Sequence, residues 1–191
     1  MHAQKKILTL PNLLTGFRFA VVPVLMFCFQ PEAGIATSLF AFFLFLSAAL
    51  TDLADGYFAR KQKSETVLGK LMDPVADKVL VASALIMLIP MDRIPAWASF
   101  IIISRELVIT GLRGVAASSG IVISASRLGK IKSVSQYTAL CILIFPLGFL
   151  PLPFLHDLGL IVLYISVALT IWSGIEYFMK FQKVFLDPSK S

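Results

Sequence analysis

The stretch LGLIVLYISVALTIWSGIEYF, residues 158–178, decides the fold class, because Glu176 is its only charged residue. A helix needs about 20 mostly apolar residues to cross a hydrocarbon core roughly 30 Å thick. The run does not alternate apolar with polar residues, as a strand of a membrane β-barrel would. The stretch therefore predicts a membrane-spanning α-helix.

Five further apolar runs extend this interpretation to the whole chain. With Leu158–Phe178 they predict six transmembrane helices, and they cover Leu13–Phe29, Ile35–Tyr57, Leu71–Ile89, Ala96–Leu112 and Val134–Leu150. Hydrophobic residues make up 58% of the 191 residues and charged residues 15%, with a mean hydropathy of +0.86. This composition argues against a disordered chain or a soluble globular protein. We expect an all-α integral membrane protein with a single domain over residues 1–191.

The basic residues predict the orientation of the spans. Of the 17 Lys and Arg, 13 lie in the terminal segments or in the connections after the second and fourth spans. Because cytoplasmic segments are enriched in Lys and Arg, both termini should be cytoplasmic. The segment Met1–Asn12 is expected to lie along the membrane surface. In so apolar a chain, the net charge of +6 indicates contact with anionic lipid rather than nucleic acid.

Four carboxylates gather where spans two and three approach the cytoplasm. Asp52 and Asp55 are three residues apart, and Asp73 and Asp77 are four apart, so each pair lies on one helical face. Four close carboxylates cannot all stay ionised unless cations neutralise them. Oxygen ligands select Mg²⁺ or Mn²⁺ rather than zinc, and two such ions would neutralise the group.

The same acids leave another interpretation open. Gly56, Ala59 and Gly69 provide room beside them for a flat ligand, but small residues also let helices pack closely. Ionisable groups within a membrane also line cation and proton pathways. A small cation or proton transporter is therefore an alternative to an enzyme.

The acidic segments together resemble the signature of the CDP-alcohol phosphotransferase family. Residues 52–77 match D-x2-D-G-x2-A-R-x8-G-x3-D-x3-D at every specified position. Other segments are similar to a bacterial branch of that family: Leu10–Arg18, Ser104–Leu107, Gly111–Arg113 and Gly129–Ser133 with Gln136. The resemblance implies transfer of a phosphatidyl group from CDP-diacylglycerol to sn-glycerol 3-phosphate, which gives phosphatidylglycerophosphate and CMP.

The resemblance also implies roles for particular residues. Asp52, Asp55 and Asp73 would be ligands of two divalent cations, and Asp77 would be a ligand or the general base. The cytidine and diphosphate of the CDP-lipid would be received by Asn12, Thr15, Gly56, Ala59, Arg60 and Gly69.

The acceptor is an anion and needs a basic pocket. Arg105, Arg113 and Lys132 are the candidates for its phosphate, and Arg18 and Lys130 are further candidates. Arg105 could instead pair with Glu106, although neighbouring residues on a helix face different ways. The other basic residues could simply mark the cytoplasmic side of the membrane.

Other acceptors remain open within the family, namely inositol phosphate, serine or phosphatidylglycerol. The acidic motif cannot distinguish them. By resemblance, we expect a homodimer in a bacterial cell (inner) membrane, surrounded by membrane lipids, with the active site on the cytoplasmic side and no nucleic-acid partner.

Overall fold

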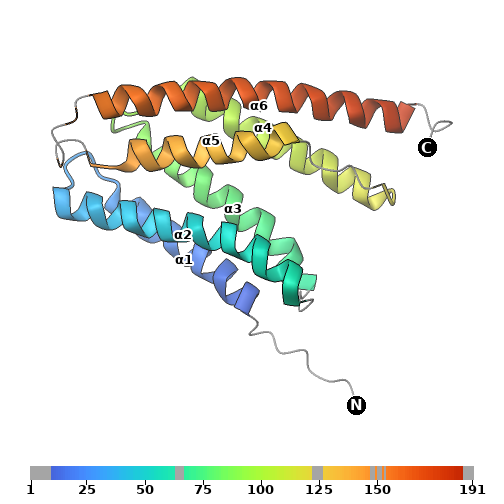
Figure 1. The fold of residues 1–191 in the computed structure, drawn as a ribbon, viewed down its shortest axis with the longest axis horizontal. Coiled ribbons are helices and arrows are strands. Elements are labelled where there is room, and N and C mark those ends of the chain that lie inside the picture. Colours follow the sequence, from blue (N-terminus) through green and yellow to red (C-terminus); the bar gives the residue numbers. More distant parts are fainter. Residues whose placement is uncertain are drawn as a thin grey trace, which may run out of the picture. The chain divides into compact units, whose positions relative to one another are not determined.

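The structure, a computed structural model, describes residues 10–62, 67–121, 127–146, 149, 152 and 154–186. These residues form helices and no strands, which confirms the all-α prediction (Figure 1). The helices are α1 (Leu10–Cys28), α2 (Ile35–Gln62), α3 (Val67–Leu88), α4 (Ala96–Ser118), α5 (Arg127–Ile144) and α6 (Phe154–Leu186).

The bounds of α5 correct one sequence prediction. The fifth apolar run was expected to be helical over Val134–Leu150, but the helix occupies Arg127–Ile144. Pro146 explains the earlier end, because a proline disfavours helical geometry at the residue before it and cannot donate a backbone hydrogen bond. The earlier start places Lys130 and Lys132 inside a helix rather than in a loop.

The longest helix, α6, is long and apolar enough over Phe154–Lys183 to cross a membrane, and an 18-residue window within it has a mean hydropathy of 2.1. Among the described residues, α1 and α2 carry shorter apolar runs, over Leu13–Cys28 and Ile35–Thr51. Large apolar side chains lie on the surface, with Phe100 71% exposed and Trp172 69% exposed. Such surface suits hydrocarbon better than water. Six spans and cytoplasmic termini stay predictions.

The chain divides into two compact units, and the first comprises residues 1–93 and 144–152. Within it, α1 packs against both α2 and α3. Leu25, Phe45 and Leu80 are fully buried there, together with Ala84 and Leu88. Residues 80, 84 and 88 follow the spacing of one helical face, so α3 buries a continuous apolar stripe.

The second unit comprises residues 94–143 and 153–191, and in it α4 packs against α6. Gly159 brings α6 close to α5, because a Cβ atom at that position would lie 2.7 Å from Leu143 Cδ2. Gly120, which has a φ of 74°, follows the C-terminal end of α4, and Ile121 donates its backbone N–H to the Ala116 carbonyl. This glycine cap closes the helix.

Candidate functional site

The acidic motif lies on two consecutive helices of the first unit. Asp52 and Asp55 belong to α2, and Asp73 and Asp77 belong to α3. Both segments are helical, and positions three or four apart in a helix lie on one face. Only residues 63–66 separate the two helices, which keeps the end of α2 near the start of α3. The side chains of Asp52, Asp55 and Asp73 lie outside the described part of the structure.

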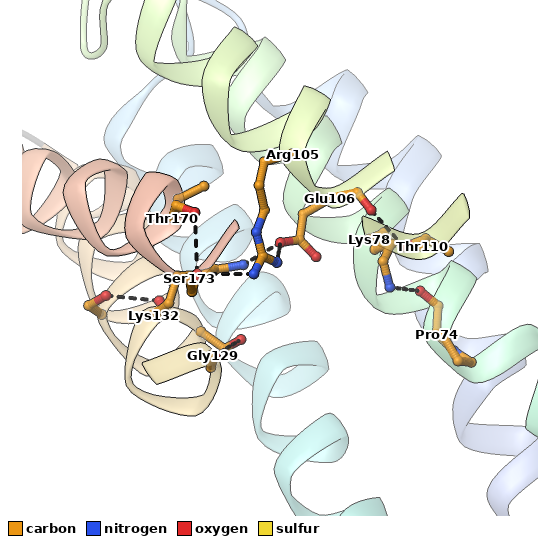
Figure 2. A network of polar contacts seen from close by, with 11 residues as sticks. Pro74, Lys78, Arg105, Glu106, Thr110, Gly129, Lys132, Thr170 and Ser173 are labelled. Carbon is orange, nitrogen blue, oxygen red and sulfur yellow. Dashed lines mark hydrogen bonds and ion pairs between the residues drawn. The ribbon is translucent and has the colours of Figure 1, made fainter. Parts of the chain in front are cut away.

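Asp77 is half-buried, and the helix before it contains Pro74. Because proline has no backbone N–H, the helical hydrogen bond from residue 74 to the carbonyl of residue 70 is missing. Lys78 donates from Nζ to the Pro74 carbonyl at 3.1 Å (Figure 2). The positively charged side chain of Lys78, the residue that follows Asp77, is therefore tied to the backbone of α3.

The residues predicted for the CDP-lipid also lie in helices of this unit. Thr15 is buried on α1, which packs against both helices of the acidic motif. The other candidates lie in helical segments whose side chains are outside the described part of the structure: Asn12, Gly56, Ala59, Arg60 and Gly69.

The residue types of the acidic motif suit hard divalent cations. They offer carboxylate oxygens only, which suits Mg²⁺ or Mn²⁺. Among the side chains that the structure describes, no group of three or more His, Cys, Asp or Glu could hold a metal ion. Three of the four motif carboxylates lie outside the described side chains, so that finding does not extend to the motif itself. The chemistry of the donor set therefore fits the expected ions.

The second unit contains a cluster of charges centred on Glu106. Its Oε1 accepts a hydrogen bond from Lys132 Nζ at 2.6 Å and another from Arg105 Nη1 at 2.8 Å. Arg105 also donates from Nη2 to Ser173 Oγ at 3.0 Å (Figure 2). The pair with Glu106 forms although the two residues are neighbours, because the arginine side chain is long enough to reach the carboxylate. The cluster thus ties α4 to α5 and α6.

A small pocket adjoins this cluster. It is lined by Arg105, Arg113, Gly129, Ser173, Glu176, Tyr177 and Lys180. The Arg113 guanidinium lies over the Tyr177 ring, 5.3 Å from its centroid, in a cation–π contact. In this conformation the pocket has room for about one water molecule. Binding of a phosphate therefore requires side chains at the rim of the pocket to move. Among the charged lining residues that form ion pairs, Lys180 has the most exposed side chain, at 47%.

The structure brings together three of the five residues predicted for the acceptor phosphate. Arg105 and Arg113 line the pocket, and Lys132 shares Glu106 with Arg105. Lys130 is exposed and is absent from the described pocket lining. Arg18 is buried on α1 in the other unit.

Sequence reasoning missed the wall that α6 contributes. Ser173, Glu176, Tyr177 and Lys180 all lie in or directly after the most apolar run of the chain. A signal was present, because residues 166, 170, 173 and 177 are polar or hydroxylated and lie on one helical face. Polar residues inside an apolar span indicate contacts within the protein.

The described residues form helices, one of them long and apolar, and they include an acidic motif and a basic pocket, a combination typical of membrane-associated enzymes that transfer phosphate-containing groups. The chain belongs to the CDP-alcohol phosphatidyltransferase family, whose profile matches residues 8–172.

Three relatives illustrate the similarity within this family. A CDP-diacylglycerol–glycerol-3-phosphate 3-phosphatidyltransferase of Bacillus subtilis is 40% identical over 189 residues, covering 90% of this chain and 94% of the relative. The protein of that name from Rickettsia felis is 39% identical, covering 92% and 97%. A cardiolipin synthase (CMP-forming) of Oryza sativa is 38% identical, covering 95% of this chain and 60% of the relative.

Proposed function

We propose that this protein transfers the phosphatidyl group of CDP-diacylglycerol to sn-glycerol 3-phosphate, which yields phosphatidylglycerophosphate and CMP. The observation that carries the proposal is the basic pocket on α4, α5 and α6, in a chain about 40% identical to transferases named for this reaction. The reaction forms a bond between the acceptor oxygen and the lipid-bearing phosphorus, and it breaks the bond from that phosphorus to CMP.

The acidic motif supports binding of the CDP-lipid. Asp52, Asp55 and Asp73 would hold two divalent cations, with Asp77 as a further ligand or as the base. When bound, such cations would neutralise the diphosphate and stabilise the charge that develops on departing CMP. Small and polar residues around the acids receive the nucleotide, and these are Asn12, Thr15, Gly56, Ala59, Arg60 and Gly69.

Asp77 is the residue we assign to the acceptor hydroxyl. A carboxylate within hydrogen-bond reach of that hydroxyl removes its proton as the oxygen attacks phosphorus. The half-buried position of Asp77 supports a carboxylate that is partly shielded from solvent.

The basic pocket supports binding of the acceptor through its phosphate. Arg105, Arg113 and Lys132 carry three positive charges, and Glu106 offsets one of them. The remaining charge of +2 complements a phosphate monoester, which carries about −1.5 to −2 at neutral pH. The planar guanidinium groups suit bidentate contact with phosphate oxygens. Arg18 and Lys130 stay further candidates for the same phosphate, although neither is among the residues that line the described pocket.

The membrane setting follows from the same substrates. A nucleotide head in water and two acyl chains in hydrocarbon require a site at the membrane surface. We propose six spans with both termini and the site on the cytoplasmic side of a bacterial membrane. The support is that most Lys and Arg lie in the terminal segments and in the connections after the second and fourth spans, and cytoplasmic segments are enriched in these residues. A homodimer is proposed from the family resemblance.

Phosphatidylglycerol is the second candidate acceptor, because the rice cardiolipin synthase is 38% identical over almost the whole chain. Its headgroup phosphate is a diester with a single negative charge. A pocket of net charge +2 therefore favours glycerol 3-phosphate.

An acceptor screen tests the proposal. The purified protein, in detergent with Mg²⁺ or Mn²⁺, is given CDP-diacylglycerol and one acceptor: glycerol 3-phosphate, phosphatidylglycerol, serine or inositol phosphate. Lipid products are identified by mass, and CMP is measured in parallel. We expect CMP and phosphatidylglycerophosphate with glycerol 3-phosphate only. Lipid product with another acceptor overturns the assignment of glycerol 3-phosphate as the acceptor. Cation flux in liposomes without any CMP release supports the transporter instead.

A further inference from the structure

Tyr177 has a buried hydroxyl that nothing in the proposed reaction yet uses. The residue is 5% exposed on α6 and lines the basic pocket. Its hydroxyl oxygen has no hydrogen-bond partner among the described residues. A buried polar group without a partner lowers the stability of a folded protein, so its retention calls for an explanation. A ligand that completes the hydrogen bond provides one.

The surroundings of Tyr177 indicate the chemistry of that ligand. The Arg113 guanidinium lies over the ring at 5.3 Å from its centroid, which limits how the ring can turn. Ser173, one turn earlier on α6, accepts a hydrogen bond from Arg105. Tyr177 thus lines the same pocket as Arg105 and Arg113, and one of these arginines covers its ring. A neutral O–H donor among guanidinium groups suits an oxyanion.

We propose that the Tyr177 hydroxyl donates a hydrogen bond to the phosphate of the acceptor, sn-glycerol 3-phosphate. This inference rests on the proposed function and adds a binding residue to it. Tyr177 transfers no proton and takes no part in bond making. Its hydroxyl costs stability in the empty protein and is satisfied only when the phosphate is bound.

This arrangement predicts opposite effects on stability and on binding. Tyr177→Phe removes the hydroxyl and keeps a ring for Arg113 to cover. The variant should unfold at the same temperature as the wild type or higher, because a buried unpaired group is gone. Its KM for glycerol 3-phosphate should rise about tenfold, as expected for losing a hydrogen bond to a charged group. The KM for CDP-diacylglycerol should change less than about twofold.

Tyr164→Phe is the matched control. Tyr164 lies on the same helix, is 42% exposed and stacks on Trp97 with ring centroids 5.6 Å apart, and it does not line the pocket. Removing its hydroxyl should leave both KM values unchanged. Thermal unfolding is also recorded for all three proteins with glycerol 3-phosphate, inorganic phosphate or glycerol, so that binding is measured without turnover. We expect the two phosphates to protect the wild type and Tyr164→Phe more than Tyr177→Phe.

The outcomes separate this inference from the proposed function. If the wild type forms product and Tyr177→Phe keeps both its acceptor KM and its phosphate protection, the role of Tyr177 is wrong and the function stands. A lower unfolding temperature with unchanged KM assigns the hydroxyl to structure and also overturns the inference. An anionic lipid headgroup presents similar oxygens, so the assays are repeated in nanodiscs with and without phosphatidylglycerol. A Tyr177→Phe effect seen only with that lipid overturns the acceptor assignment.

Discussion

Lys132 and Glu106 join α5 to α4 through an ion pair of 2.6 Å between Nζ and Oε1, in which the lysine side chain is only 4% exposed. The same carboxylate oxygen accepts from Arg105 at 2.8 Å. A single glutamate therefore holds two cations that we assign to the acceptor phosphate. The pair connects residues 26 positions apart in the sequence and contributes both to packing and to the charge of the pocket.

Glu106→Gln should destabilise the protein. The substitution removes the charge that compensates buried Lys132, and breaking a buried pair costs about 3 kcal/mol. Thermal unfolding in detergent, followed by circular dichroism, measures the loss. Lys180→Met is the control, because its pair with Glu176 is largely exposed and such pairs contribute less than about 1 kcal/mol. Similar losses in the two variants would show that Lys132 does not depend on Glu106.

Arg113→Ala should raise the KM for glycerol 3-phosphate by about tenfold or more, since a charge-assisted contact to phosphate is lost. The KM for CDP-diacylglycerol should stay nearly constant. Arg113→Lys keeps the charge but loses the planar group that covers the Tyr177 ring, so it should lie between alanine and wild type. Steady-state kinetics with each substrate varied in turn measures both constants. Equal effects on the two substrates would contradict an acceptor pocket.

Gly174→Ala should weaken acceptor binding without loss of stability. A Cβ atom there would lie 3.3 Å from Arg105 Cγ, so the arginine must shift by a few tenths of an ångström. We expect the KM for glycerol 3-phosphate to rise about threefold to tenfold, because small misplacements of a positioning group are costly.

Gly114→Ala is the control for this substitution, since a Cβ at position 114 on α4 meets nothing within 4 Å. Both variants gain about 1 kcal/mol of helix propensity. Kinetics and thermal unfolding of the two are compared. Unchanged kinetics in Gly174→Ala would mean that Arg105 shifts without weakening acceptor binding.

Asp77→Asn should reduce turnover by about 100-fold or more, the usual effect of losing a general base or metal ligand. Asp92→Asn is the matched control, because Asp92 is exposed in a turn with a φ of 54°, a conformation that Asn also tolerates. CMP release measures turnover, and EDTA should abolish it in the wild type until Mg²⁺ or Mn²⁺ is restored. Full turnover by Asp77→Asn would remove Asp77 from the mechanism.

Local pattern was sufficient for much of the fold. The apolar runs located all six helices, because burial and helix formation leave a direct trace in composition and periodicity. The bounds of α5 were wrong because hydropathy continues through Leu150, whereas the helix ends at Ile144, shortly before Pro146, which disfavours its continuation. The acidic motif was also readable from the sequence, since its residues lie on two consecutive helices.

The sequence by itself therefore determined the helical class, the acidic motif and the candidates Arg105, Arg113 and Lys132. Only the tertiary structure decided that Glu106 serves two of those cations, and that Ser173, Gly174 and Tyr177 form the wall beside them. The physical reason is that a local pattern records what one helix needs in order to form. Which side chains of distant helices meet depends on how those helices pack, and Arg105 and Ser173 are 68 residues apart in the chain.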